Sequence, residues 1–488
     1  MNHEKVAKIE YALAVLLSID YTDEKRNPSR KLIERILLEC CRDFEKISIN
    51  RKTSSMLESL FPIGFLSVRG EAFPWQFANA SLERYSPHDE WMERNLGFTV
   101  SDAIKFSKAI MKYCIKKDLM LNFRWNFPPF GKREYYFPFY LYVPPEGYVE
   151  KYWKHIITIP YEKLQLIVPR DSHIRLGNYL SRMSLDIEKE RPAINNPLDF
   201  NILYMKPLVK IDNEYILPIP RLLWQALSTT FHYDFLRDKN YLGRYIDEKG
   251  KAAERRMITA LSKIFPMEEL FPRVRYSKRK GWPDIDLVID DEEATLFLEC
   301  TAKWITIDAK IGKKEAIISD LRNSIEKCHK QLNRAIQAYK EGKLGPFKSK
   351  KLLPVIVIDD FIPGLEYLLQ FCDFLTKPRP YIINIYSLEI LCEISEKREF
   401  LDFISMRMEL SKLNIMFGTD EIDYFLHFKK YGTKYIEMLK EVKMPLLYIA
   451  HMEDLYPNYY KEHFLKFLDD EELANKLSQL TGWERGWS

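Results

Sequence analysis

Residues 250–361 follow an ordered succession of helical and extended hydrophobic patterns, which constrains the fold more than any other feature of the chain. An amphipathic helical pattern at 250–265 precedes two extended patterns, at 284–290 and 295–303. A long helical pattern at 313–340 and an apolar run at 351–361 complete the series. Helices that alternate with strands predict an α/β domain in which helices flank a mixed sheet.

The composition of the 488 residues is that of an ordinary globular protein, with 46% hydrophobic and 30% charged residues. The net charge of +4 is small, so any signal for nucleic-acid binding has to be local. Seven cysteines without a CxxC pair argue against a zinc ribbon or a disulfide framework. The sequence lacks a long apolar run and a cleavable leader, which predicts no membrane contact and a cytoplasmic location.

Changes in composition and hydrophobic pattern along the chain predict four regions, one of which is the α/β domain. Thr99 to Asp102 reads as a capping box at the start of a helix, and Asp212-Asn213 as the turn of a β-hairpin. The expected regions are a helical part at 1–120, an aromatic-rich mixed α/β part at 121–230, the α/β domain at 231–395 and a helical part at 396–488.

The two extended patterns bring acidic side chains together. Residues two positions apart share one face of a strand, so Asp284 and Asp286 lie together on the first strand. Glu299, Thr301 and Lys303 share a face of the second strand, with which the first forms a hairpin. Carboxylates beside a lysine suit Mg²⁺, with Mn²⁺ as a substitute, because these cations prefer oxygen ligands. A bound metal would activate water, and the lysine would stabilise the transition state.

This stretch resembles the PD-(D/E)xK nuclease superfamily, to which restriction endonucleases belong, over about 165 of the 488 residues. Pro283-Asp284 is a literal PD pair, and the order of helix, strands, helix and strand is similar. The resemblance implies a restriction endonuclease-like fold and a metal-dependent nuclease that hydrolyses phosphodiester bonds, most simply in DNA. It implies Asp286 as the first metal ligand, Asp284 as the second, Glu299 as the acidic residue of the second strand and Glu254 as the helix glutamate of the site.

The sequence departs from this pattern at the lysine, because Thr301 stands two residues after Glu299 where the family has Lys. We expect Lys303 to take over the role from the same strand face. Two alternatives remain open. The domain can be a catalytically inactive restriction-like fold that binds nucleic acid, or the chain can be an interaction subunit of a defence or repair assembly.

Basic residues surround the acidic hairpin and favour a polyanionic partner. Between Lys310 and Lys351 there are 12 Lys and Arg residues against four acidic ones, enough to hold phosphates without reading sequence. DNA is the expected partner, RNA is not excluded, and a homodimer or a larger complex is possible. The residues expected to contact nucleic acid are Arg273, Arg275, Lys278, Arg279, Lys280, Gln331 and Arg334.

Overall fold

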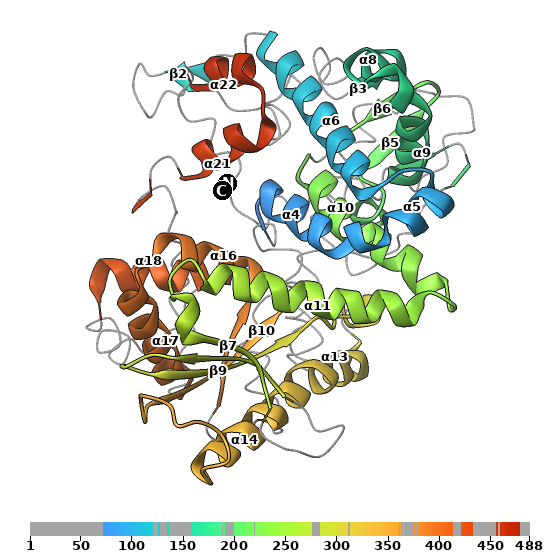
Figure 1. Ribbon diagram of the computed structural model, residues 1–488. Coiled ribbons are helices and arrows are strands. Elements are labelled where there is room, and N and C mark those ends of the chain that lie inside the picture. The colour runs from blue at the N-terminus through green and yellow to red at the C-terminus, as the bar shows by residue number, and fades with distance from the viewer. Residues whose placement is uncertain are drawn as a thin grey trace, which may run out of the picture. The chain divides into compact units, whose positions relative to one another are not determined.

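The computed structural model (Figure 1) divides the chain into two compact units. The helical unit contains the described residues of 72–245 and 456–478, and the sheet unit contains those of 246–455. The predicted helices of residues 1–71 lie outside the described residues. The structure describes residues 72–120, 125–126, 134–135, 158–187, 189–190, 200–218, 220–275, 284–310, 313–360, 362, 365, 375, 379–412, 421–432, 455–456 and 459–478.

The helical unit combines helices with a four-stranded sheet in the order β3-β6-β5-β4. Its strands are β3 (Thr158–Pro160), β4 (Ser184–Asp186), β5 (Leu208–Ile211) and β6 (Glu214–Ile216), and a separate pair joins β1 (Trp125–Asn126) to β2 (Glu134–Tyr135). Its helices are α4 (Pro74–Tyr85), α5 (Asp89–Leu96), α6 (Val100–Met120), α8 (Tyr161–Ile167), α9 (His173–Met183), α10 (Pro220–Arg237), α21 (Tyr459–Leu468) and α22 (Glu471–Ser478).

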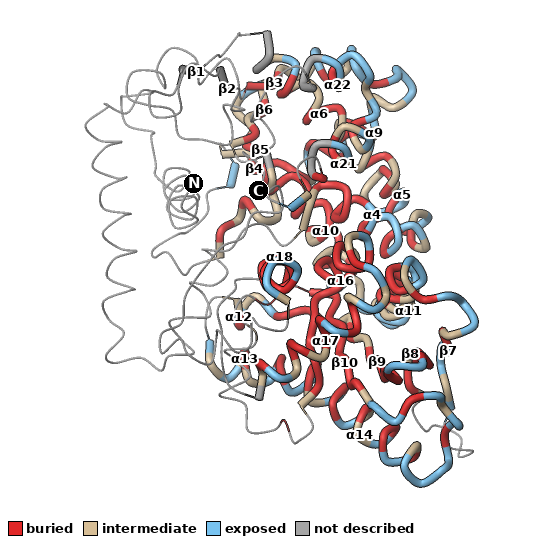
Figure 2. The backbone as a smooth tube through the Cα atoms, turned by 90° about the vertical axis from the view of Figure 1, so that its left-hand side faces the viewer, coloured by how far each residue is buried: buried red, intermediate tan, exposed pale blue. Residues whose placement is uncertain are grey.

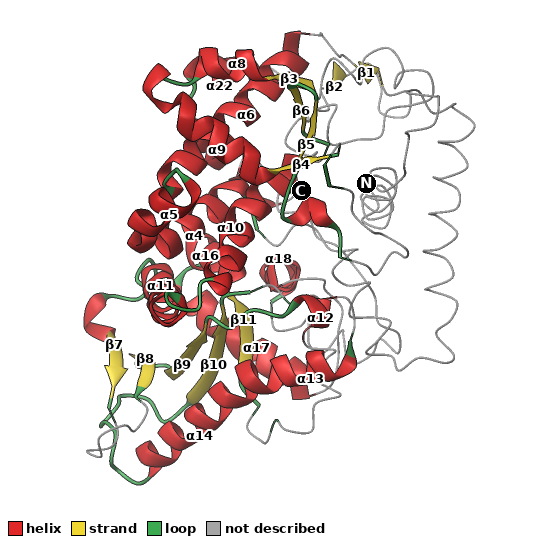
Figure 3. Cartoon of the chain, turned by 90° about the vertical axis from the view of Figure 1, so that its right-hand side faces the viewer, coloured by secondary structure: helices red, strands yellow, loops and turns green. Residues whose placement is uncertain are grey.

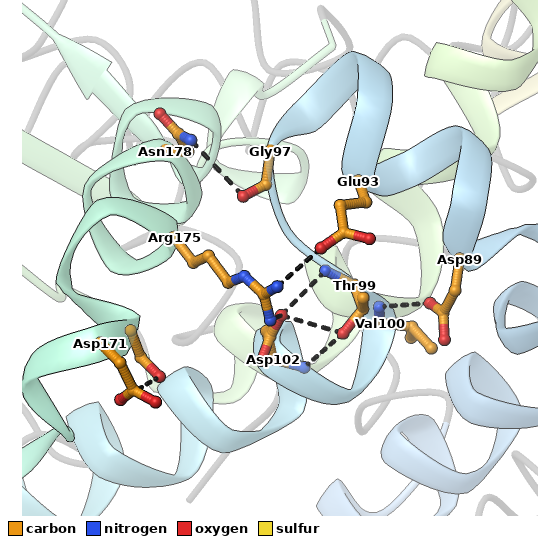
Figure 4. A network of polar contacts seen from close by, with 10 residues as sticks. Asp89, Glu93, Gly97, Thr99, Val100, Asp102, Asp171, Arg175 and Asn178 are labelled. Atoms are coloured by element: carbon orange, nitrogen blue, oxygen red, sulfur yellow. Dashed lines mark hydrogen bonds and ion pairs between the residues drawn. The ribbon is translucent and has the colours of Figure 1, made fainter.

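A polar network fixes the start of α6 (Figure 4). The predicted capping box is confirmed, because the Thr99 backbone N–H donates to Asp102 and the Asp102 N–H donates to the Thr99 hydroxyl. Arg175 of α9 then donates to Asp102 at 3.2 Å and to Glu93 of α5 at 2.6 Å. The network therefore ties three helices together around one helix start.

The predicted hairpin is also confirmed, since β5 and β6 are antiparallel and Asp212 turns between them with a φ of 52°. The segment that follows the sheet unit in the sequence completes the helical unit. Phe467 of α21 packs edge-on against the fully buried Trp224 of α10, with ring centroids 5.0 Å apart. Two stretches of sequence far apart in the chain thus share one core.

The sheet unit is built on a mixed five-stranded sheet in the order β11-β10-β9-β8-β7. The strand β8 pairs antiparallel with both β7 and β9, whereas β9, β10 and β11 run parallel to one another. The expected α/β class with a mixed sheet is confirmed by this arrangement. The strands are β7 (Leu270–Val274), β8 (Ile285–Asp290), β9 (Thr295–Thr301), β10 (Leu352–Ile358) and β11 (Tyr381–Asn384).

Helices cover both faces of this sheet (Figures 1 and 3), with α11 on one face and α13 and α14 on the other. The helix predicted at 250–265 is longer than expected, and a π-helical turn, η8, interrupts the helix predicted at 313–340. The described helices are α11 (Leu242–Leu261), α12 (Ile307–Lys310), α13 (Lys314–Leu321), η8 (Arg322–Glu326), α14 (Lys327–Lys340), α16 (Ile385–Ile394), α17 (Lys397–Lys412) and α18 (Glu421–Tyr431).

The strands β9 and β10 are buried along most of their length (Figure 2) because helices cover both faces. Val288 of β8 stands opposite Phe297 of β9, and both belong to the core beneath α14. Leu332 and Ile336 of α14 supply the apolar side of that core. Each such fully buried side chain contributes about 1.5–3 kcal/mol to folding.

The two units differ from the four regions expected from composition. Helices α17 and α18 belong to the sheet unit, whereas α21 and α22 belong to the helical unit. Short connections within the described residues, such as η2 (Ser86–His88), η5 (Arg170–Ser172), η6 (Ile202–Tyr204) and η7 (Met267–Glu269), are 3₁₀ turns. No helix in the described part of the chain is long and apolar enough to cross a lipid bilayer.

Candidate functional site

Asp286 and Glu299 meet at the end of the β8–β9 hairpin. The last register pair at this end is Leu287 with Leu298, so the next positions along the two strands are Asp286 and Glu299. Both lie on the same face as the Val288–Phe297 pair, because side chains alternate along a strand. The face is the one that α14 covers, and the predicted meeting of these two carboxylates is therefore present.

The carboxylate of Asp286 replaces a backbone partner where the ladder ends. Its Oδ2 accepts a hydrogen bond of 2.7 Å from the backbone N–H of Cys300. Burial raises the pKa of Asp286 to about 7, although this hydrogen bond opposes the shift. The negative charges of Glu254 and Asp284 add to the increase. Asp286 is thus half-buried, held in place and close to other carboxylates.

Glu299 is the most confined carboxylate of the site, with only 2% of the residue exposed. Burial raises the pKa of Glu299 to about 10, and the charge of Asp286 is the next largest cause. Among the described residues its Oε1 has no hydrogen-bond partner. An unsatisfied buried polar group costs about 1–3 kcal/mol, and more when it is charged. The position therefore calls for a proton or a cation at Glu299.

The side of the site nearest the helix core is apolar. Cys328 of α14 is 4% exposed and belongs to the core that covers this sheet face. Burial raises the pKa of its thiol, and the charges of Glu299 and Asp286 raise it further. The thiol is therefore neutral packing next to the carboxylates. The sequence alone does not predict this proximity, because Cys328 lies 29 positions beyond Glu299.

Glu254 lies on α11, and its carboxylate forms an ion pair with Arg273. The Nη2 and Nε atoms of Arg273 both donate to Glu254 Oε2, at 2.7 and 3.1 Å. Two residues along α11, Arg256 makes a buried ion pair of 2.9 Å with Asp359, which follows β10. Asp359 is 2% exposed, so this pair fixes α11 against the sheet and holds Glu254 in place.

Arg273 has a backbone conformation that is unusual for its residue type. Its φ is 52°, in the left-handed region that disfavours residues with a Cβ, and such strain costs about 1–3 kcal/mol. The pairs Pro272–Leu287 and Val274–Ile285 place it opposite Asp286 on the edge strand β7. The predicted nucleic-acid contact Arg273 is therefore part of the acidic site.

Lys303 does not lie where the sequence pattern predicts it. The strand β9 ends at Thr301, so the prediction that Lys303 continues the strand and shares its face is wrong. Lys303 Nζ instead lies 3.6 Å from Asp320 Oδ1 of α13. Asp320 also accepts the N–H and hydroxyl of Thr306, which fixes the segment after the strand. Lys303 makes no ion pair with Asp286 or Glu299 among the described residues.

Thr301 takes the position two residues after Glu299 on the same face. It is 8% exposed, and its hydroxyl accepts the Lys303 backbone N–H at 3.3 Å. Asp284, the second predicted metal ligand, lies just before β8 and is half-buried, and its charge raises the pKa values of Asp286 and Glu299. Asp284 thus lies near the pair, as expected.

The remaining predicted contacts with nucleic acid divide into two groups. Arg275 after β7 and Arg334 on α14 are exposed, and Gln331 is half-buried on the same helix. Lys327, also on α14, is a further exposed cation without an ion pair among the described residues. Lys278, Arg279 and Lys280 lie outside the described residues.

The residues of the site can hold a divalent cation with only one or two protein ligands. Within the described residues, no three His, Cys, Asp or Glu side chains form a ready metal-binding group. Mg²⁺ does not need one, since one or two protein carboxylates with water and substrate phosphate complete its shell. The unpartnered Glu299 Oε1 beside Asp286 supplies that minimum.

Comparisons with family models, curated proteins and solved structures found no match for this chain.

Proposed function

We propose that the chain is a metal-dependent nuclease that hydrolyses phosphodiester bonds, with DNA as its first candidate substrate. The observation that carries the proposal is the buried, partly unsatisfied Glu299, which follows the last register pair of the β8–β9 hairpin on one strand as Asp286 does on the other. Asp286 accepts the Cys300 N–H, but a buried and a half-buried carboxylate this near to each other still repel, and a divalent cation is the ligand class that offsets this cost.

Asp286 and Glu299 would hold the cation, and Asp284 and Glu254 are within electrostatic reach to assist them. When bound, the metal would lower the pKa of a water and neutralise charge on the phosphate. Asp286 is oriented for this task by the Cys300 N–H, and Cys328 and its core exclude water from one side. The exposed cations Lys327 and Arg334 would hold the backbone of the substrate.

A second function has a specific observation in its favour. Lys303 is engaged by Asp320 and lies beyond the strand, and Thr301 occupies the usual lysine position. A site that lacks its lysine can bind nucleic acid without cutting it. We therefore retain a catalytically inactive nucleic-acid-binding or interaction subunit as the alternative.

Cleavage assays separate the two functions. The full chain is incubated with supercoiled plasmid, single-stranded DNA and RNA in Mg²⁺, Mn²⁺ or EDTA. A nuclease cuts in the presence of metal and loses activity in Glu299→Gln and Asp286→Asn. Binding without cleavage under every condition would instead establish the inactive alternative.

A further inference from the structure

We propose that Arg273 and Glu254 form a switch that couples the binding of a nucleic-acid phosphate to the binding of a divalent cation. The inference rests on the proposed function, because it concerns the same acidic site. In the free protein, Arg273 holds Glu254. In the complex, a backbone phosphate takes over the guanidinium, and Glu254 is left as a free carboxylate within electrostatic reach of Asp286 and Glu299.

The geometry of the ion pair permits this exchange. Both donors of Arg273 bind Oε2 of Glu254, so the guanidinium is committed to one carboxylate oxygen. The Arg273 side chain is 56% exposed, whereas that of Glu254 is 24% exposed. A phosphate in solution can therefore reach the guanidinium. Its planar fork binds phosphate as well as carboxylate, so the exchange needs no new donor.

Electrostatics give the exchange its direction. The negative charges of Glu254 and Asp284 raise the pKa values of both Asp286 and Glu299, and the charge of Asp286 raises that of Glu299 further. Arg273 is the cation whose charge opposes the shift at Asp286. Without a metal, a free Glu254 would add to the repulsion, so its pairing with Arg273 is favourable. With a metal bound, the negative charge of the same carboxylate would be attracted to the cation and would favour its binding.

The backbone holds the guanidinium in place. Arg273 lies on β7 between two register pairs, with φ at 52° and Asp286 opposite. Residues held in such conformations cluster at ligand clamps and switch regions. Arg256, fixed by Asp359, immobilises the part of α11 that carries Glu254. Both partners of the switch therefore have fixed backbones, and only their side chains need to move.

The first test measures the affinity for a mixed-sequence 16-base-pair DNA duplex in EDTA. Glu254→Gln frees Arg273 and should tighten binding about fivefold or more, within the range typical of coupled sites. In an Arg273→Gln background the same change should have little effect. Glu248→Gln is the matched control, because Glu248 lies on the same helix, is also 24% exposed and pairs with Lys251 instead. If Glu254→Gln has the same effect with and without Arg273, no switch exists.

The second test measures Ca²⁺ affinity by calorimetry, with and without the duplex. Arg273→Gln should tighten Ca²⁺ binding without DNA, and only when Glu254 is present. If Arg273→Gln folds poorly, Arg273→Lys is used in its place. Arg273→Lys keeps the positive charge but loses the planar fork of the guanidinium, and it should weaken the dependence of Ca²⁺ affinity on Glu254. Additive effects of the Arg273 and Glu254 changes would overturn the switch alone. Absence of Ca²⁺ binding by the unaltered protein would overturn the proposed function together with the switch.

Discussion

The backbone N–H of Cys300 donates a 2.7 Å hydrogen bond to the carboxylate of Asp286 at the point where the β8–β9 ladder ends. A side chain thus takes the place of the next strand carbonyl. This bond ties Asp286 to the residue that follows Glu299, which sets the two carboxylates side by side. The site is therefore a consequence of the point at which the β8–β9 ladder ends.

The free energy of unfolding should fall as pH rises in the absence of metal. The folded-state pKa values of Asp286 and Glu299 are raised, to about 7 and about 10, from ordinary values near 4. Their stabilising contribution is complete below about pH 4, and rising pH removes it through pH 7 for Asp286 and through pH 10 for Glu299. Urea unfolding in EDTA at pH 5, 7 and 9 measures the slope.

Glu299→Gln should flatten this pH dependence and stabilise the metal-free protein at pH 9 by about 1–3 kcal/mol, because an amide is already neutral, whereas Glu299, with its pKa raised to about 10, has to take up a proton when the protein folds at pH 9. The control is Glu248→Gln on α11, because Glu248 is half-buried and already paired with Lys251. An unchanged slope in Glu299→Gln would show that Glu299 is not the group that titrates.

Divalent cations should stabilise the unaltered protein but not its Glu299→Gln variant. A ligand at 100 times its dissociation constant adds about 2.7 kcal/mol to the free energy of unfolding. Thermal unfolding at pH 8 with Ca²⁺ or Mn²⁺ measures the shift in Tm. Equal shifts in both proteins would place the cation elsewhere.

Thr301→Lys should raise metal-dependent cleavage, because position 301 shares the face of Glu299 and Lys303 does not continue the strand. One well-placed electrostatic donor is worth about 10²–10³ in rate. Single-turnover cleavage of a labelled duplex gives the rate of the chemical step. The same assay is applied to Lys303→Ala. A large loss of cleavage rate in this variant, with unchanged affinity for DNA and metal, would show that Lys303 takes part in the reaction although it is paired with Asp320.

Charge reversal on α14 should weaken nucleic-acid binding alike for all sequences. Lys327→Glu and Arg334→Glu remove exposed cations that have no ion pair among the described residues. The slope of log affinity against log salt should fall by about two for the double variant, if each cation neutralises one phosphate. Lys343→Glu is the comparison, since Lys343 is exposed but already paired with Glu341. An unaffected slope would remove α14 from the interface.

Arg256→Met should destabilise the sheet unit by about 3–5 kcal/mol, because it removes the ion pairs that the buried Arg256 makes with Asp359 and Glu389. Lys263→Met, which disrupts an exposed pair with Glu393, should cost less than about 1 kcal/mol. Denaturant unfolding of both variants provides the comparison. Similar small losses would mean that Asp359 does not depend on the arginine.

Sequence patterns predict the β8–β9 hairpin and the presence of carboxylates on both of its strands, because alternation along a strand is a local property. The end of β9 was not predictable in this way. The strand stops at Thr301, and the following segment turns so that Trp304 Nε1 donates to the Asp359 carbonyl and Ile305 N–H donates to Asp360. These bonds join positions 55 residues apart, and they carry Lys303 away from its expected face.

The same limit applies to Glu254 and Arg273. Each was predicted to belong to the site or its surroundings, but their ion pair depends on a positive φ at Arg273 that no local residue pattern requires. The π-helical turn within the helix predicted at 313–340 cannot be predicted from the sequence either, because its hydrophobic spacing resembles that of an ordinary helix. Nearby contacts follow from periodicity, whereas contacts between distant segments need the fold.

The shared core of Trp224 and Phe467 has a consequence for the order of synthesis. A ribosome makes α10 long before α21, and the described residues of the sheet unit emerge between them. The apolar surface of α10 that α21 covers must wait for the last helices, whereas the β8–β9 hairpin and its flanking helices can assemble earlier on the nascent chain. The candidate site on the β8–β9 hairpin can therefore fold before the core of the helical unit is complete. Until α21 is made, the uncovered apolar surface of α10 is open to chaperones and proteases.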